Sequence, residues 1–130
     1  MTSPVAIMLN SSSPTFGQAG VSPEEVHREV ERICAHPLFS NAPMLRRFLR
    51  FTIEKTLAGQ LDAVKEYTIG SEGLGRGTSF DPARSSIVRT QAFNLRQRLN
   101  ALYEEQGTPN SFRIVFEPGS YVPAFEPAQP

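Results

Sequence analysis

The stretch that decides the fold is Asp81–Gln106, DPARSSIVRTQAFNLRQRLNALYEEQ. Its apolar residues recur at alternating steps of four and three, which at about 3.6 residues per turn form one stripe along a helix: Val88, Ala92, Leu95, Leu99 and Leu102. Asp81 suits an N-cap, Pro82 suits the first helical position, and Gly107 follows the last turn. We therefore predict one long helix over residues 82–106.

The remaining surface of this helix is basic and rich in amides, and no acidic residue occurs between Asp81 and Glu104. Such a face suits a negatively charged partner. Arg, Gln and Asn also carry donors and acceptors that match base edges in the major groove of DNA. We therefore predict that this segment is a DNA-recognition helix.

The composition limits the other function classes. The chain has 130 residues, which suits one domain, and its net charge of zero argues against a general polyanion binder. The charge is nevertheless unevenly distributed along the chain, because residues 81–113 hold five arginines against three acidic residues. The single cysteine, Cys34, suits a reducing cytoplasm, and the apolar run Val5–Leu9 is too short for a signal peptide or a membrane span. We expect a cytoplasmic, nucleoid-associated protein without a membrane partner.

The N-terminal residues 1–20 contain SSSPTFGQAG and lack hydrophobic periodicity, so we expect a disordered tail. A protein-binding motif around Val5–Leu9 is the less favoured alternative. We predict a folded domain over residues 21–126 and a frayed end over 127–130.

Three helices are expected before the long one. The first begins with a capping box, Ser22-Pro23-Glu24-Glu25, and stops at His36-Pro37. The second is capped by Ser40 or Asn41, has Pro43 in its first turn, and ends at Ala58-Gly59. The third is short and runs from Asp62 to Ile69. The following GSEGLGRG segment lacks the spacing of a phosphate-binding loop, so we predict an irregular turn.

A β-hairpin follows the long helix, with strands over 111–116 and 121–125. The turn Glu117-Pro118-Gly119-Ser120 places Pro and Gly where a type II turn requires them. Pro123 predicts a short or edge strand. The predicted fold class is therefore mainly α with a C-terminal β-hairpin, in a winged helix-turn-helix arrangement with hairpin 111–125 as the wing.

The segment SSIVRTQAFNLRQRLNALYEE and the hairpin FRIVFEPGSYVPAF resemble the C-terminal winged-helix effector domains of OmpR/PhoB-type transcription regulators. The match rests on Val88, on Leu95-Arg96-Gln97-Arg98-Leu99 and on Gly119-Ser120-Tyr121, with Lys65–Gly70 where that family has its positioning helix. Residues 21–125 look closer still to an N-terminal domain of poorly characterised bacterial signalling and tetratricopeptide-repeat proteins. The resemblance implies a DNA-binding transcription regulator that assembles as a homodimer or a larger oligomer.

Within this hypothesis the N-terminal half of the helix meets the bases. The predicted base-reading residues are Arg84, Arg89, Thr90, Gln91 and Asn94. The residues predicted to contact the DNA backbone are Arg96, Arg98 and Arg113, with Arg46 and Arg47 on the second helix as a further clamp or as solvated side chains. Possible self-assembly contacts are Phe51, Tyr103 and Phe125.

No catalytic constellation is evident, and we expect neither an enzyme nor a cofactor. Cys34, His27 and His36 lack a fourth partner, so no metal site is predicted. The alternative function is a non-catalytic protein-interaction module on the same scaffold. The zero net charge and Glu117, which stands where a DNA-touching wing usually has Arg or Lys, favour that alternative.

Overall fold

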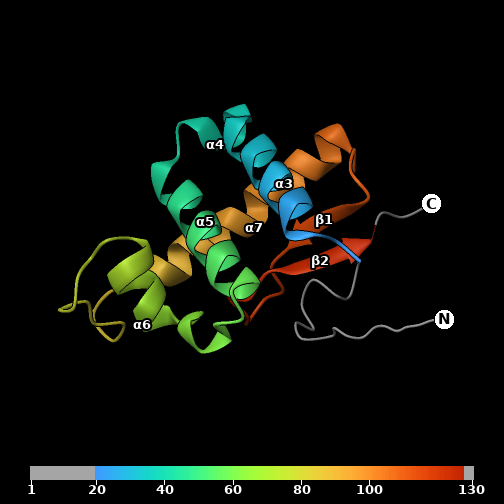
Figure 1. The fold of residues 1–130 in the computed structure, drawn as a ribbon. Helices are drawn as coiled ribbons and strands as arrows, with labels where there is room; N and C mark the ends of the chain where they lie inside the picture. Colours follow the sequence, from blue (N-terminus) through green and yellow to red (C-terminus); the bar gives the residue numbers. More distant parts are fainter. Residues whose placement is uncertain (1–19, 128–130) are drawn as a thin grey trace.

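The computed structural model describes residues 20–127, so nearly all of the predicted tail 1–20 and residues 128–130 of the predicted frayed end lie outside the described part. The described chain is mainly helical and ends in a two-stranded antiparallel hairpin, as predicted (Figure 1). Its elements are α3 (Pro23–Ala35), α4 (Pro37–Ser40), α5 (Pro43–Leu57), η1 (Leu61–Ala63), α6 (Glu66–Thr68), η2 (Ile69–Gly73), α7 (Ile87–Gln106), β1 (Phe112–Val115) and β2 (Ala124–Pro127).

Helix α3 begins as the sequence predicts. The Ser22 hydroxyl accepts a hydrogen bond from the Glu25 backbone N–H, and the Glu25 carboxylate accepts one from the Ser22 N–H. At the other end, the ring of His36 caps α4 by accepting the Leu38 N–H at Nδ1. Helix α5 differs from the prediction, because its N-cap is Ala42, which offers no side-chain bond.

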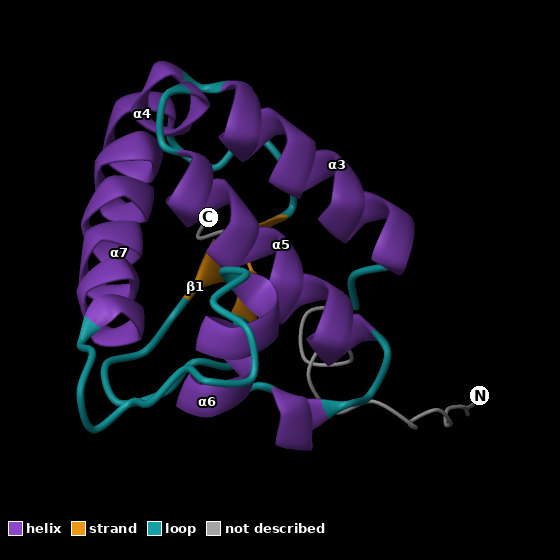
Figure 2. Ribbon diagram, turned by 90° about the vertical axis from the view of Figure 1, so that its left-hand side faces the viewer, coloured by secondary structure: helices purple, strands orange, loops and turns teal. Residues whose placement is uncertain are grey.

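The core lies where α5 and α7 cross, and α7 runs along one side of the domain (Figure 2). The predicted stripe of α7 is buried throughout: Val88, Ala92, Leu95, Leu99 and Leu102. The fully buried side chains that α5 places against it include Phe48, Leu49 and Ile53. The burial of these apolar surfaces is the main favourable free-energy contribution to the fold.

The start of α7 corrects the prediction, because the helix begins at Ile87 and not at Pro82. Asp81 instead closes a separate turn: its carboxylate accepts the Ala83 N–H, and its carbonyl accepts the N–H groups of Arg84 and Ser85. The Ser85 hydroxyl then accepts the Ile87 N–H. Short polar side chains that bond the local backbone compete with helix formation, and Asp81 and Ser85 do so here.

The predicted third helix is also different. Asp62 lies in the short 3-10 turn η1, and α6 begins only at Glu66 after extended backbone at Lys65. The chain then continues as the π-helical segment η2, which begins at Ile69 and otherwise lies within the stretch predicted to be a loop. A Cβ on Gly70 would lie 2.3 Å from the Phe80 ring, and one on Gly73 would lie 2.9 Å from the Phe51 ring. Glycine is therefore required where both rings approach the backbone.

The hairpin pairs Phe112 with Pro127, Arg113 with Glu126, Ile114 with Phe125 and Val115 with Ala124. The predicted turn is present, since the Ser120 N–H bonds the Glu117 carbonyl and Gly119 has a positive φ of 85°. The second strand starts later than predicted, at Ala124, and extends to Pro127. Tyr121 packs instead edge-on against Phe48 of α5, with ring centroids 6.2 Å apart.

A buried carboxylate joins α3 to α7 and to the hairpin. Glu29 has no exposed surface and accepts hydrogen bonds from Arg32, from the Tyr103 hydroxyl at 2.5 Å and from the Asn110 amide at 2.6 Å. The same hydroxyl accepts the Ile114 N–H of β1 at 3.0 Å. Burial and the charge of Glu29 raise the pKa of Tyr103 far above its ordinary value, so this phenol remains a donor to the carboxylate.

Replacing Tyr103 by Phe removes this link and retains the ring. The Ile114 N–H and one Glu29 oxygen lose a partner in a buried site, so we expect the free energy of unfolding to fall by about 2–3 kcal/mol. Urea denaturation followed by circular dichroism measures the change. Tyr67→Phe is the control, because the Tyr67 hydroxyl bonds the Thr78 carbonyl at an exposed position and its removal should cost about 0.5 kcal/mol or less. Equal losses in the two variants would contradict the role of Tyr103.

Candidate nucleic-acid interface

The face of α7 that points away from the core is polar but contains one exposed aromatic ring. Thr90, Phe93 and Gln97 are exposed on the side opposite the buried stripe, and the exposed Arg89 flanks them; we call these four residues the outer strip. Phe93 is 58% exposed, the largest value among the big apolar side chains of residues 20–127. The helix therefore presents a mixed surface, not a uniformly basic one.

Sequence reasoning left Phe93 and Gln97 out of the base-reading set. The signal was present, because steps of three and four from Thr90 reach Phe93 and Gln97, and the buried stripe occupies the opposite side. The arginines were predicted to read bases because of their charge. An arginine at the edge of a helix face, however, reaches its own domain as readily as a partner.

Arg89 lies in the N-terminal half of α7, as predicted, and because the helix begins at Ile87 it falls in the first turn. Its Nη1 donates to Oε2 of Glu66 at 2.5 Å, and the pair joins α7 to the first residue of α6. The Arg89 side chain is nevertheless 52% exposed, so the rest of its guanidinium meets solvent.

The other predicted base-reading residues are scattered. Thr90 is exposed, whereas Gln91 and Asn94 are half-buried at the edges of the helix. Arg84 does not lie on α7, contrary to the prediction, because the helix begins after it. Its side chain is 88% exposed in the preceding turn, with Nε 3.6 Å from the Asp81 carboxylate.

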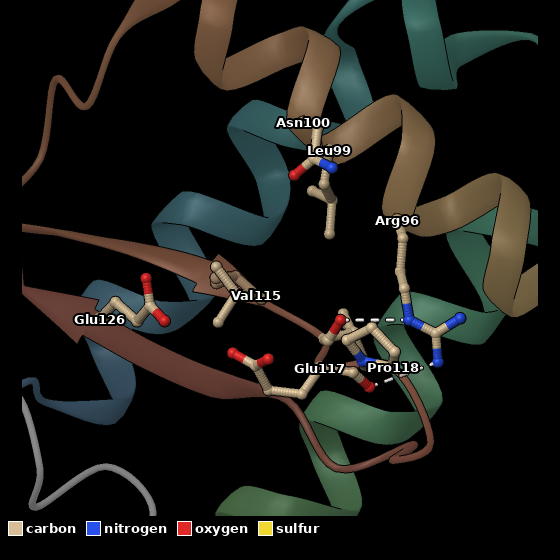
Figure 3. A pocket seen from close by; sticks show the side chains of 9 residues that line it. Arg96, Leu99, Asn100, Val115, Glu117, Pro118 and Glu126 are labelled. Carbon is tan, nitrogen blue, oxygen red and sulfur yellow. Dashed lines mark hydrogen bonds between the residues drawn. The ribbon is translucent and has the colours of Figure 1, made fainter.

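Arg96 holds the hairpin loop against α7. Its Nε donates to the Phe116 carbonyl at 3.1 Å, and its Nη2 donates to the Glu117 carbonyl at 3.4 Å (Figure 3). The same Nη2 donates to the Ser120 carbonyl at 3.3 Å. These bonds span the turn around Gly119. Arg96 therefore fixes the position of the loop relative to the outer strip, a structural role that its sequence pattern did not reveal.

Arg98 and Arg46 both bond to α4 through backbone carbonyls. Arg98 Nη1 donates to the Leu38 carbonyl at 2.7 Å, and Arg46 Nη1 donates to the carbonyls of Phe39 and Ser40. The last carbonyls of a helix lack partners within it, and these guanidiniums supply them. Their predicted contacts with a DNA backbone stay predictions, but both side chains already have partners inside the domain.

The remaining predicted backbone contacts differ in exposure. Arg113 lies on β1, with Nε 3.8 Å from the Glu126 carboxylate and its guanidinium 6.0 Å from the centre of the Tyr103 ring. Arg47 is exposed on α5 and lies over Gly75. Arg50, next to it on the same helix, pairs with Glu31 of α3 at 2.6 Å.

Two cavities separate α7 from the hairpin, and Arg96 borders both. The first, of about 260 Å³, is lined by Arg89, Ala92, Arg96, Gly119 and Tyr121. The second, of about 240 Å³, lies on the side of Asn100 and is bordered by the carboxylates of Glu117 and Glu126 (Figure 3). Of the two cavities beside Arg96, one is therefore bordered by a second arginine and the other by two carboxylates.

The side chains first considered for metal binding serve other roles. His27 pairs with Glu54 at 3.2 Å, His36 pairs with Glu105 at 2.7 Å, and burial raises the pKa of the Cys34 thiol. Among the described residues, no three His, Cys, Asp or Glu side chains gather as metal ligands would. No helix between residues 20 and 127 is long and apolar enough to cross a membrane.

Two of the residues suggested for self-assembly are internal. Tyr103 is 6% exposed and Phe125 is 1% exposed, so neither can form a surface contact between copies. Phe51 is half-buried and packs over Gly73, with the Lys55 ammonium 5.6 Å from its ring centre.

Replacing Arg96 by Gln removes three carbonyl bonds and should free the hairpin loop. A loss of about 1.5 kcal/mol in local stability corresponds to roughly tenfold faster amide hydrogen exchange over residues 117–122. Arg98→Gln is the matched control, since it removes the same charge from the same helix but should loosen only the region of α4. Unchanged exchange at the loop in Arg96→Gln would contradict the anchoring role.

Comparison of this chain with models of known protein families, with curated proteins and with solved structures found no match.

Proposed function

We propose that this chain is a winged helix-turn-helix module that binds double-stranded DNA and regulates transcription. In this proposal the N-terminal half of α7 enters the major groove and the β1–β2 hairpin is the wing. The observation that carries it is the outer strip, an exposed row of side chains suited to base edges on a helix whose opposite side is buried. A recognition helix requires this combination.

The elements around α7 support the arrangement. Helix α6 and segment η2 precede α7 and are joined to its first turn by the Glu66–Arg89 pair. The hairpin loop lies beside the N-terminal half of α7, because Arg96 bonds it and Arg89 lines a cavity with Gly119 and Tyr121. In helix-turn-helix proteins a preceding helix crosses the DNA backbone while the second helix lies in the groove.

The chemistry of the outer strip indicates what it would read. A glutamine such as Gln97 can bond adenine at N6 and N7, and the methyl group of Thr90 and the ring of Phe93 can contact a thymine methyl. Arg89 adds a donor fork for guanine or for a phosphate. No acidic residue interrupts α7 before Glu104, and the exposed Arg84 lies just before its start. We expect dimeric binding to repeated half-sites.

The second candidate is a protein-interaction module, and two specific observations favour it. Arg96, Arg98 and Arg46 donate hydrogen bonds to carbonyls inside the domain and not to a partner. Phe93 is an exposed aromatic anchor of the kind that dominates protein interfaces. Both candidate functions use the same side chains at the contact. The experiment must therefore distinguish DNA from a protein as the partner.

Selection from a randomised duplex pool, followed by anisotropy titration of the enriched duplex, tests DNA recognition directly. Gln97→Ala should weaken binding to the enriched duplex relative to a scrambled one by about 1–3 kcal/mol, because a bidentate base contact is lost. Gln106→Ala is the control: it is the same truncation on the same helix, about 13 Å further along its axis. It should leave the preference unchanged.

The salt dependence separates the two candidates. Binding to DNA should weaken steeply between about 50 and 200 mM salt, because neutralising phosphates releases counterions. If no duplex is enriched, or if Gln97→Ala and Gln106→Ala behave alike, the DNA proposal is wrong. Retention of a defined protein partner that Phe93→Ala abolishes, in nuclease-treated extract, would then support the interaction module.

A further inference from the structure

The cavity of about 260 Å³ between α7 and the hairpin loop has the features of an anion site. Arg89, Ala92 and Arg96 line it from α7, and Gly119 and Tyr121 line it from the loop. Arg89 and Arg96 are seven residues apart and therefore lie on one side of the helix, about 10 Å apart along its axis. Two guanidiniums thus border one opening.

The positive charge of this cavity is only partly neutralised. Arg89 pairs with the Glu66 carboxylate. Arg96 bonds carbonyl oxygens, and no carboxylate among residues 20–127 lies within ion-pair distance of it. One full positive charge therefore remains, held in place by three bonds to the hairpin loop.

Several hydrogen-bond donors at the cavity have no protein partner. Within the described chain, Nη1 of Arg96, Nε and Nη2 of Arg89 and the Tyr121 hydroxyl form no hydrogen bond. Burial and the nearby Glu66 charge raise the pKa of Tyr121, although Arg89 and Arg96 oppose the shift, so the phenol is protonated and available as a donor.

We propose that this cavity binds a phosphate group through Arg89, Arg96 and Tyr121. Arginine forks match the oxygens of phosphate, and the hairpin carbonyls orient Arg96 before any ligand arrives. The volume equals about nine water molecules at about 30 Å³ each, which leaves room for the ester substituent of the phosphate. The source is a DNA backbone phosphate, in which case the inference rests on the proposed function, or a free phosphate or nucleotide.

The carboxylate of Glu66 allows a direct test of this proposal. It lies 2.5 Å from Arg89 and competes with any anion for that guanidinium. Glu66→Gln keeps the shape of the side chain but removes the competing charge. Phosphate should therefore bind more tightly to this variant, a gain that damage to the fold would not produce.

The test is a titration of the full chain with inorganic phosphate and pyrophosphate at constant ionic strength, followed by amide chemical shifts. We expect saturable shifts centred on Gly119 and Tyr121. Glu66→Gln should tighten binding about tenfold and Arg89→Gln should weaken it about tenfold, the range expected for one charge-assisted contact. Arg28→Gln, which removes an exposed arginine of α3 outside the cavity, should leave the affinity unchanged.

A parallel titration with a random-sequence duplex identifies the source. If Glu66→Gln tightens DNA binding and pyrophosphate competes with the duplex, the site takes a backbone phosphate. If phosphate binds as described and DNA does not, the anion site stands and takes a free ligand, although the proposed DNA function fails. Absence of saturable shifts at Gly119 and Tyr121 in both the native chain and Glu66→Gln overturns the inference.

Discussion

The arrangement of the domain depends on the buried carboxylate of Glu29. A charge without exposed surface is costly unless its oxygens are bonded, and here Arg32, Tyr103 and Asn110 bond them. These partners come from α3, from α7 and from the connection to β1, and Tyr103 passes the link to the Ile114 N–H. The hairpin is consequently fixed to the C-terminal part of α7 by a polar network, while Arg96 fixes the hairpin loop nearer the N-terminus of the same helix. Two separate polar links therefore set the orientation of the hairpin relative to the outer strip.

The second constraint is the use that the chain makes of its arginines. Guanidiniums at helix edges stabilise the domain by bonding backbone carbonyls of α4 and of the hairpin loop, as Arg46, Arg96 and Arg98 do. The zero net charge of the sequence thus coexists with a small number of cations that remain open to a partner. This explains why the candidate interface is a narrow strip with one adjacent positive cavity and not a broad basic surface.

Periodicity and caps predicted the parts of the fold that local physics determines. The stripe from Val88 to Leu102 is buried, Ser22 caps α3 as expected, and Gly59 and Gly119 adopt positive φ where turns required it. The predicted start of α7 was wrong, because the Asp81 turn and the Ser85 hydroxyl bond the local backbone N–H groups and compete with the helix. Two glycines of η2 lie against the rings of Phe80 and Phe51, and no local pattern encodes these contacts. The partners of the arginines were equally inaccessible, because a long side chain reaches residues far away in the sequence, such as the 60-residue separation of Arg98 and Leu38.

We propose that the N-terminal half of α7, together with the hairpin loop, is the surface that meets DNA. Hydrogen exchange of the full chain with and without an enriched duplex tests it most directly. We expect slowed exchange to concentrate at Arg89–Gln97 and at residues 117–122, with exchange in α3 unchanged. Slowed exchange confined to α3 and the exposed side of α5, with the outer strip unaffected by the duplex, would contradict it.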